Sequence, residues 1–295
     1  MQVGFIGCVD SSRASLKTLL NVKGLSVVAV VTRDSSTVNS DFCDLTDICI
    51  ENSIPYHYEN PNLRSESIDF LKQYDLDAIF CIGWSYLLDL RILNLTKLGV
   101  IGFHPARLPQ NRGRHPIIWA LALGLTKTAS TFFLMDEGAD SGPIVSQEDI
   151  KIDRLDDATS LYQKIVKTSQ KQLKKIGHDL VNGTIKKIEQ NHNQATYWRK
   201  RIRNDGIVDF RMSANNIYNL IRALAPPYPG AEFIFNNEHI KIPKSKVCDF
   251  QYDLNIEPGK VIKKKENDLL VKVAGTQAIW LHGLKKNNIE AGDYL

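Results

Sequence analysis

Two polar turns carry the side chains best suited to acid–base chemistry, and each follows an apolar run. His104 ends the run at residues 100–104, and Asp140 lies in a glycine-containing turn after the β-branched and aromatic run at 131–135. An imidazole has an ordinary pKa near 6.5, and a carboxylate against one ring nitrogen raises its basicity and fixes its tautomer. His104 therefore has the properties of a general base. A strand-end histidine can also be purely structural, and spacing alone does not place Asp140 beside it.

The segment after His104 offers further polar groups. Residues 105–115 contain two prolines and a glycine among polar side chains, which predicts an irregular loop between a strand and a helix. Arg114 and His115, at the end of this loop, are rival candidates for contact with a substrate.

A third polar segment, residues 7–13, follows the first apolar run and precedes a helix-period segment. Backbone amides at the start of a helix, together with Ser12 and Arg13, could hold an anion. The segment lacks the G-x-G-x-x-G pattern, so it does not indicate a dinucleotide site. The alternative is a plain turn in which Ser11 or Ser12 caps the helix.

The elements that would position these side chains alternate along the first 200 residues. This alternation predicts an α/β fold with a doubly wound, Rossmann-like, mostly parallel sheet. Apolar runs predict strands at residues 3–6, 25–32, 78–82, 100–104 and 131–135. Helices are expected after residue 12, after residue 41, at 117–123 and from 156 to about 180. Because such sheets bind ligands beyond the carboxyl ends of their parallel strands, the polar segments after the strands form the candidate site.

The composition changes near residue 200, where we place a domain boundary. A polar stretch covers residues 186–205, and short strand-like runs separated by turns follow the Pro-Pro-Tyr-Pro-Gly segment at 226–230. Several short strands predict a small β-barrel or sandwich. We therefore expect a catalytic domain at residues 1–200 and a smaller β-rich, OB-like subdomain at residues 201–295.

Composition excludes several classes of protein. The 295 residues are 43% hydrophobic and 24% charged, which is typical of a globular chain. The net charge of +4 is too small to indicate a nucleic-acid partner. No apolar window reaches the roughly 18 residues that a membrane span needs, and the amino terminus does not resemble a secretory leader, so a cytoplasmic protein is expected.

The five cysteines form no C-x-x-C pair, so neither a disulfide framework nor a metal site is indicated.

Residues 100–142 resemble the catalytic core of the 10-formyltetrahydrofolate-dependent formyltransferases. In that family the motif runs Asn-x-His, then Leu-Pro, Arg-Gly and a Leu-Asp-x-Gly-like turn. The corresponding residues here are His104, Leu108-Pro109, Arg112-Gly113 and Ala139-Asp140-Ser141-Gly142. Segments 207–210, 221–224 and 227–231 look like the junction into the family's carboxyl-terminal β-subdomain, so the resemblance covers essentially the whole chain.

The resemblance implies direct transfer of a formyl group from 10-formyltetrahydrofolate, the formyl donor, to an amine. His104 would accept the proton of the amine, and Asp140 would orient the imidazole and support its cationic form. No covalent enzyme intermediate is needed, and the chain has no Gly-x-Ser-x-Gly elbow. The family's pterin contacts imply cofactor-binding residues in two segments, namely Trp84, Tyr86, Leu87 and Ala139.

One position departs from the family. Gly102 stands where the family has the asparagine whose amide helps to stabilise the oxyanion. By analogy with other oxyanion holes, loss of such a donor costs roughly 3 to 4 kcal/mol of transition-state stabilisation. The replacement donor is open among Asn111, His115, a protonated His104 and a backbone amide.

Two branches of the family differ in the amine that they formylate. The segments at 102–106, 111–116 and 228–231 look more like the sugar-nucleotide N-formyltransferases than like the methionyl-tRNA formyltransferases, which act on a polyanion and call for a more basic surface. A pyrophosphate needs only a few cations. The candidate substrate contacts are Ser12, Arg13, Arg112, Arg114, Arg201 and Tyr228.

The resemblance therefore implies that the exocyclic amine of a nucleotide-linked amino dideoxy sugar is the acceptor, for surface-glycan biosynthesis. Two alternatives stay open: a methionyl-tRNA formyltransferase, and a non-catalytic relative that binds folate or a sugar nucleotide. Family members often pair through the carboxyl-terminal region, so a homodimer is a further expectation.

Overall fold

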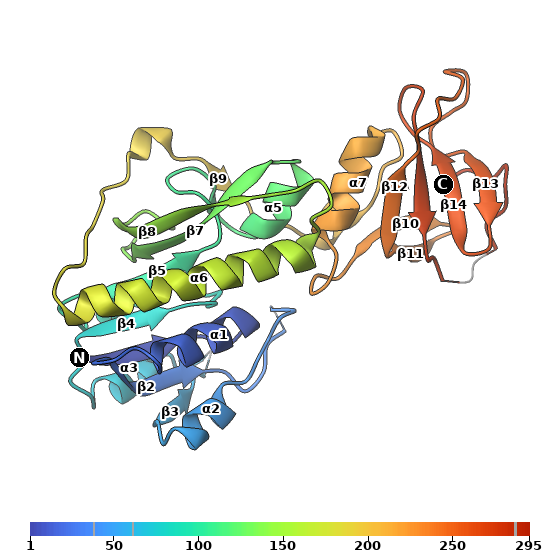
Figure 1. The fold of residues 1–295 in the computed structure, drawn as a ribbon. Coiled ribbons are helices and arrows are strands. Elements are labelled where there is room, and N and C mark those ends of the chain that lie inside the picture. The colour runs from blue at the N-terminus through green and yellow to red at the C-terminus, as the bar shows by residue number, and fades with distance from the viewer. Residues whose placement is uncertain (38, 61, 286–287) are drawn as a thin grey trace. The chain divides into compact units, whose positions relative to one another are not determined.

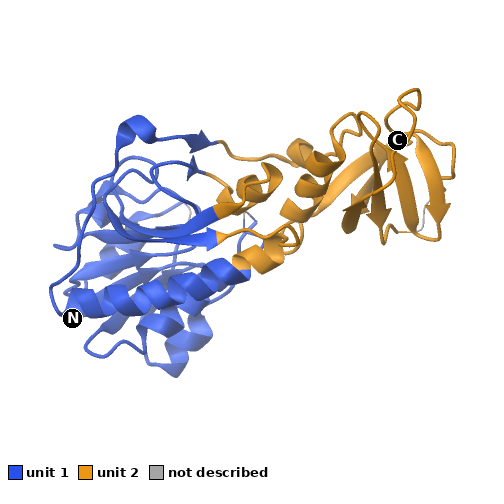
Figure 2. Ribbon diagram, turned by 45° about the horizontal axis from the view of Figure 1, so that its top comes forward, with its two compact units in different colours: residues 1–113, 128–150, 163–198 blue, residues 114–127, 151–162, 199–295 orange. Residues whose placement is uncertain are grey.

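Figure 1 presents the fold in a computed structural model, which describes residues 1–37, 39–60, 62–285 and 288–295. The chain forms two compact units, coloured separately in Figure 2. Unit 1 comprises residues 1–113, 128–150 and 163–198, and unit 2 comprises residues 114–127, 151–162 and 199–295. The chain therefore passes from one unit to the other several times.

Unit 1 is built on a sheet that has seven strands within the described residues, in the order β3-β2-β1-β4-β5-β7-β8. Adjacent strands from β3 to β5 are parallel, whereas β7 is antiparallel to β5. The prediction of a mostly parallel, doubly wound sheet is thus confirmed. The strands are β1 (Gln2–Ile6), β2 (Ser26–Thr32), β3 (Tyr56–Tyr58), β4 (Ala78–Cys81), β5 (Val100–His104), β7 (Lys127–Leu134) and β8 (Ile144–Lys151).

Helices cover both faces of this sheet, and each face has its own apolar core. On one face Phe5 and Phe132 pack with α1 (Asp10–Leu19), α2 (Thr46–Glu51) and the unit 1 part of α6 (Ala158–Val181). On the other face α3 (Ser65–Leu71) and α4 (Leu90–Leu93) pack against a second cluster around Ile79. In Figure 1, α1 and α6 lie side by side across the sheet. This packing explains why the run at β2 is almost continuously apolar.

The start of α1 differs from the sequence-based expectation. The helix begins at Asp10 with Val9 at the N-cap, so Ser11 and Ser12 lie inside the first turn. The Ser12 hydroxyl accepts a hydrogen bond from the Val9 amide at 3.1 Å and donates to the Ile82 carbonyl at 2.6 Å. The expectation that a serine caps this helix from the preceding position is therefore wrong, because the Ser12 side chain instead ties the helix to the loop after β4.

Two neighbouring strands place His104 on the sheet. Gly102 and His104 of β5 pair with Phe133 and Thr131 of β7, so both β5 residues point to the same face. After β5 come the short strand β6 (Arg112–Gly113) and, in unit 2, α5 (Pro116–Ala122). The strand β6 pairs in parallel with β9 (Tyr197–Trp198), which follows the 3-10 turn His192–Gln194. Residues 105–115, called the histidine loop below, are thus fixed to a segment about 85 residues later.

Unit 2 is strand-rich, as the sequence predicts, and also contains α5, α7 and the start of α6. Residues 231–242 form a hairpin, and a separate four-stranded sheet has the order β12-β15-β14-β13 within the described residues. The elements are the 3-10 turn Arg203–Gly206, α7 (Ala214–Ala223), β10 (Ala231–Phe235), β11 (Glu238–Ile242), β12 (Lys244–Val247), β13 (Val261–Lys265), β14 (Asp268–Lys272) and β15 (Ala278–His282). Helix α7, which begins after the N-cap Ser213, packs against α5. Among the described residues no helix has the length and apolar character that a membrane crossing requires.

A buried carboxylate in unit 2 should make stability depend on pH. Glu232 is 1% exposed, and its carboxylate contacts Arg203 Nε at 2.8 Å, Lys241 Nζ at 2.8 Å and His239 Nδ1 at 3.0 Å. Arg203 first, and then Lys241 and His239, lower the pKa of Glu232 to about 2. Because an unfolded glutamate titrates near 4.3, this carboxylate stabilises the fold above that pH, and its contribution is lost as the pH falls toward 2.

We therefore expect Glu232→Gln to lower the free energy of unfolding by about 1 to 3 kcal/mol at pH 7, and by much less near pH 2.5. Urea unfolding followed by circular dichroism at both pH values measures the difference. Glu238→Gln, which removes an exposed carboxylate from β11, is the matched control. An equal loss of stability for Glu232→Gln at both pH values would contradict the assignment.

Candidate functional site

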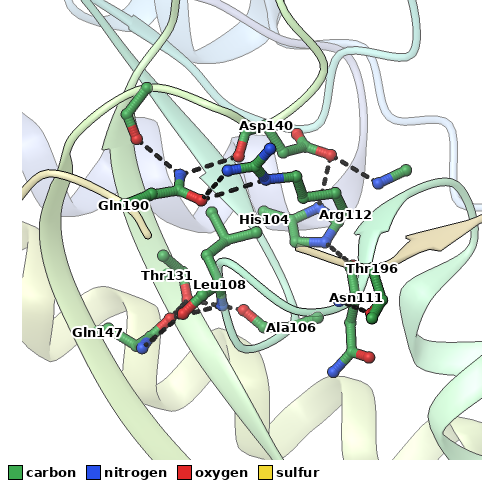
Figure 3. Close-up of polar contacts among 12 residues, drawn as sticks. His104, Ala106, Leu108, Asn111, Arg112, Thr131, Asp140, Gln147, Gln190 and Thr196 are labelled. Atoms are coloured by element: carbon green, nitrogen blue, oxygen red, sulfur yellow. Dashed lines mark hydrogen bonds and ion pairs between the residues drawn. The ribbon is translucent and has the colours of Figure 1, made fainter. Parts of the chain in front are cut away.

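The imidazole of His104 lies at the carboxyl end of β5 and is 4% exposed. Its Nε2 atom is 2.7 Å from the main-chain carbonyl oxygen of Asn111 (Figure 3). A carbonyl oxygen can only accept, so Nε2 must carry the hydrogen of this bond. In the neutral ring the lone pair is then on Nδ1, which lies 3.6 Å from Oδ2 of Asp140. The structure thus brings together the two residues of the imidazole–carboxylate pair.

Asp140 reaches this position from a tight turn at residues 136–142, called the aspartate turn below. Its backbone has a positive φ of 54°, and its Oδ2 atom accepts a hydrogen bond from the Gly113 amide at 2.8 Å. Within the turn, Asp136 accepts hydrogen bonds from the Gly138 amide and the Ser141 hydroxyl. The Gly113 amide therefore holds the carboxylate at ion-pair distance from Nδ1 of His104, farther than a direct hydrogen bond.

A buried glutamine joins the histidine loop to the aspartate turn. The Gln190 amide nitrogen donates to the carbonyls of Asp140 at 2.9 Å and Gly142 at 2.6 Å, while its oxygen accepts from Arg112 Nη2 at 2.7 Å. Figure 3 shows these contacts converging from three separate segments of the chain. Sequence analysis missed Gln190, because a glutamine within a polar stretch gives no chemical signal. Its position shows that residues near 190 complete the site.

Arg112 is 1% exposed, and every nitrogen of its guanidinium takes part in contacts at this junction. Besides Gln190, it donates to the Tyr197 hydroxyl at 2.8 Å and contacts His192 Nδ1 at 3.2 Å. Gly113 beside it has φ of 104°, and a Cβ there would lie 2.3 Å from the Trp198 carbonyl oxygen. The Arg-Gly pair of the motif therefore has a structural explanation, and a substrate contact by Arg112 stays a prediction.

A second glutamine fixes the first half of the histidine loop. Gln147 of β8 accepts from the Leu108 amide at 2.7 Å and donates to the Leu108 carbonyl at 3.2 Å. The Thr131 hydroxyl of β7 donates to the Ala106 carbonyl at 2.6 Å. The loop backbone is thus bound to β7 and β8 on one side and to β9 on the other, which restricts movement of the Asn111 carbonyl that holds the imidazole.

The space beside Gly102 is filled by Met135 and Phe133. A Cβ built on Gly102 would lie 2.7 Å from Met135 Cγ and 3.1 Å from Phe133 Cζ. Contacts of 2.7 Å are shorter than packed carbon atoms tolerate. The glycine is therefore matched to its neighbours in this chain, and no side-chain amide reaches the imidazole from position 102.

Two other residues were expected to supply an oxyanion donor. Asn111 has φ of 63°, and its main-chain amide donates to the Thr196 hydroxyl at 2.9 Å. In Figure 3 its side-chain amide points away from the imidazole. His115, in unit 2, accepts a hydrogen bond from the Arg201 amide at Nδ1, and burial followed by the nearby Arg114 lowers its pKa.

Several predicted substrate contacts already have protein partners. Ser12 is fully buried, and Arg13 donates to the Asp44 carbonyl at 2.9 Å and pairs with Asp47. In unit 2, the Arg201 guanidinium lies 4.7 Å from the Trp119 ring centre and donates to the Asp205 carbonyl. Arg114 and Tyr228 are half-buried residues of unit 2. Binding of a substrate by any of these five residues stays a prediction.

The predicted cofactor contacts lie in the loop after β4 and in the aspartate turn. Trp84 and Tyr86 meet edge to face with ring centres 5.8 Å apart, and Leu87 is 77% exposed. Ala139 is also exposed. Exposed apolar groups beside half-buried aromatic rings can line the faces of a flat heteroaromatic ring such as a pterin, whose polar edges would need hydrogen bonds from elsewhere. The cofactor role of these residues is untested by the geometry and stays a prediction.

The cysteines are arranged as free thiols without a metal cluster. Burial raises the pKa of Cys8 to about 11 and that of Cys49 to about 12, so both thiols stay protonated near neutral pH. Across the described ranges no group of three or more histidine, cysteine, aspartate or glutamate side chains is placed to hold a metal ion.

Comparison with known families gives two matches that together span most of the chain. Residues 10–176 match the family model described as "Formyl transferase". Residues 201–295 match the one described as "Formyl transferase, C-terminal domain".

Two relatives are similar to this chain over different shares of their own length. The bifunctional polymyxin resistance protein ArnA of Wigglesworthia glossinidia brevipalpis is 32% identical over 98% of this chain, which spans only 43% of that protein. The methionyl-tRNA formyltransferase of Clostridioides difficile (strain 630) is 29% identical over 84% of this chain and 81% of its own length.

Solved structures share the fold at lower identity. WlaRD, a sugar 3N-formyl transferase solved with dTDP and 5-N-formyl-THF, has a TM-score of 0.72 and 19% identity, covering 98% of each chain. The N-formyltransferase of Helicobacter canadensis, in complex with folinic acid and dTDP-3-aminofucose, has a TM-score of 0.71 and 20% identity, covering 95% of this chain and 98% of its own. These likenesses confirm the predicted fold.

Restoring an asparagine at position 102 should cost stability in this chain. Gly102→Asn forces a Cβ against Met135, and overpacking of this kind costs about 1 to 3 kcal/mol. Thermal unfolding measures the loss. In the double variant with Met135→Ala, the combined loss should be smaller than the sum of the two single losses, because the smaller side chain makes room. A Gly102→Asn protein as stable as the parent would contradict the packing argument.

Proposed function

The chain belongs to the formyl transferase family, and on that premise we propose that it transfers a formyl group from 10-formyltetrahydrofolate to the exocyclic amine of a nucleotide-linked amino dideoxy sugar. The observation that carries the proposal is the His104 imidazole, with Nε2 bonded to a carbonyl and Nδ1 facing the Asp140 carboxylate. We assign the folate and sugar-nucleotide sites to residues 1–200 and treat residues 201–295 as a β-rich subdomain.

The choice of a sugar amine is supported by the relatives of similar fold. WlaRD and the Helicobacter canadensis enzyme are both sugar or amino-sugar formyltransferases solved with dTDP or a dTDP-sugar and a formylated folate. The small net charge of +4 supports the same choice, because a tRNA substrate needs extensive phosphate contacts. Surface-glycan biosynthesis is the role that this substrate class suggests.

The proposed reaction has a defined path for each proton and bond. The uncharged amine of the sugar attacks the formyl carbon, a C–N bond forms to the acceptor, and the bond to N10 of the folate breaks. The amine loses one proton, which His104 accepts at Nδ1, and the imidazolium then gives that proton to N10 of the folate as it leaves, which regenerates the neutral ring. Between the two transfers the imidazolium donates from Nε2 to the Asn111 carbonyl and from Nδ1 toward Asp140, so both hydrogens have an acceptor.

The folate contributes the activated formyl group, and the protein's part is to position it beside the imidazole. We assign its contacts to Trp84, Tyr86, Leu87 and Ala139. As donor to the developing oxyanion we propose Asn111, since its side-chain amide donates to none of the described residues and its main chain is bonded to the imidazole. Sugar-nucleotide contacts by Ser12, Arg13, Arg112, Arg114, Arg201 and Tyr228 remain part of the proposal, with Arg112 also holding the loop.

A methionyl-tRNA formyltransferase is the alternative that a specific observation favours, because the Clostridioides difficile enzyme of that name is 29% identical to this chain. The deciding experiment offers the purified protein 10-formyltetrahydrofolate with dTDP-, UDP- and GDP-linked amino sugars, and separately with charged initiator tRNA. Formylation of a sugar amine supports the proposal. Formylation of the tRNA and of no sugar overturns the substrate assignment, and tight ligand binding without turnover identifies a non-catalytic binder.

Replacing the base should separate catalysis from binding. His104→Asn is expected to lower kcat about 10²- to 10⁴-fold, because an amide cannot accept the amine's proton as the imidazole does. Binding of folinic acid, measured by isothermal titration, should stay within about threefold of the parent. His178→Asn, on the exposed face of α6, is the matched control. Near-normal kcat in His104→Asn would reject its role as base.

Asn111→Gly tests the oxyanion assignment independently, because glycine adopts the positive φ of this residue without strain and so keeps the carbonyl that holds His104. Loss of an oxyanion donor costs about 10²- to 10³-fold in kcat. Steady-state kinetics on the accepted sugar nucleotide measure the effect. Unchanged kcat would leave the oxyanion to the imidazolium or to a backbone amide.

A further inference from the structure

Arg33 is a buried arginine with unused hydrogen-bond donors. It directly follows β2, at the carboxyl edge of the sheet, and is 9% exposed. Its Nε and Nη1 atoms are inaccessible to solvent and donate to no atom among the residues that the structure describes. A buried guanidinium without acceptors is costly, so such groups usually have a partner. The missing partner of Arg33 must be an acceptor.

The surroundings of Arg33 concentrate positive charge. Its guanidinium carbon lies 4.7 Å from the ring centre of Tyr86, and that of Arg64 lies 5.6 Å from the same centre. Two cations thus share one aromatic ring. The buried carboxylate of Glu59 is 3.8 Å from Arg64 and also attracts Arg33 at longer range, so two guanidinium groups share one carboxylate. An anion beside Arg33 would balance the remaining positive charge and supply the missing acceptors.

The other arginines proposed for substrate contact in unit 1 are differently placed. Arg13 is paired with Asp47, and Arg112 is fully engaged with Gln190, Tyr197 and His192. Arg33 differs from both, because two of its guanidinium nitrogens have no acceptor among the described residues.

Arg33 lies close enough to His104 for one extended ligand to contact both residues. It follows β2, whereas His104 ends β5, and β1 and β4 lie between them. Three inter-strand spacings amount to about 14 Å. An extended nucleotide sugar with its amine at the imidazole can span that distance, and so can a folate with its glutamyl tail.

We propose that Arg33, supported by Arg64 across the Tyr86 ring, binds the anionic group of one of the two substrates: the pyrophosphate of the sugar nucleotide or a carboxylate of the folate's glutamyl tail. The assignment rests on the proposed function, since that function supplies both anions. A phosphate and a carboxylate each present two oxygens that a guanidinium fork can bind in a bidentate manner.

Direct binding tests this assignment without turnover. Binding of dTDP, of inorganic pyrophosphate and of folinic acid to the full chain is measured by isothermal titration for the parent, Arg33→Met and Arg33→Lys. We expect Arg33→Met to weaken one of the two substrate classes at least tenfold, and Arg33→Lys to weaken the same class less. Weaker dTDP and pyrophosphate identifies the nucleotide as source, and weaker folinic acid identifies the glutamyl carboxylate. Arg91→Met, which removes an exposed arginine of α4, is the control.

Thermal unfolding separates a binding role from a structural one. Without ligand, Arg33→Met should melt at or above the parent temperature, because it removes a buried unpaired charge. The anion identified above should raise the melting temperature of the parent and not of Arg33→Met. Unchanged affinity of Arg33→Met for all three probes overturns the proposal. A parent that binds folinic acid through Arg33 yet formylates no sugar would refute the proposed function alone.

Discussion

The main-chain carbonyl of Asn111 determines which form of His104 the site contains. Because that oxygen can only accept, Nε2 of the ring is committed as a donor, and the basic nitrogen is the one that faces Asp140. A histidine free to rotate would present either nitrogen. Here the backbone selects one, so the chemistry depends on the conformation of a loop residue whose φ is positive. Every other contact of the site can be understood as support for that carbonyl or for the carboxylate opposite it.

That support comes from segments far apart in the sequence. Gln190 binds the carbonyls of the aspartate turn with one end and Arg112 of the histidine loop with the other. Gln147 and Thr131 hold the first half of the histidine loop to β7 and β8. Each of these polar groups is satisfied by main chain or by another buried side chain, which makes a network rigid rather than costly. The pair is thereby positioned before any substrate arrives.

The sequence could predict those parts of the molecule in which apolar residues form a continuous run or recur at a regular period. The run at β2 is continuously apolar because helices cover both faces, and the helix from Ala158 to Val181 follows a regular amphipathic period. His104 and Asp140 could be matched through the resemblance. By contrast, β3 has only three residues with exposed tyrosines, so no periodicity marks it. Gln190 and Arg33 were missed because their importance comes from burial and from unpaired or shared hydrogen bonds, and burial of a polar residue depends on distant neighbours.

The path of the chain between the two units has a consequence for modularity. Helix α5 precedes β7 in sequence, yet it packs in unit 2 against α7, and its Trp119 indole donates to the Arg199 carbonyl. Residues 114–127 and 151–162 are therefore integral to a unit whose remaining sequence lies beyond residue 198. A gene fragment that ends between the two halves would expose the apolar face of α5 to solvent and leave α7 without its packing partner. Evolutionary exchange of the strand-rich half is thus constrained to partners that preserve the α5–α7 interface.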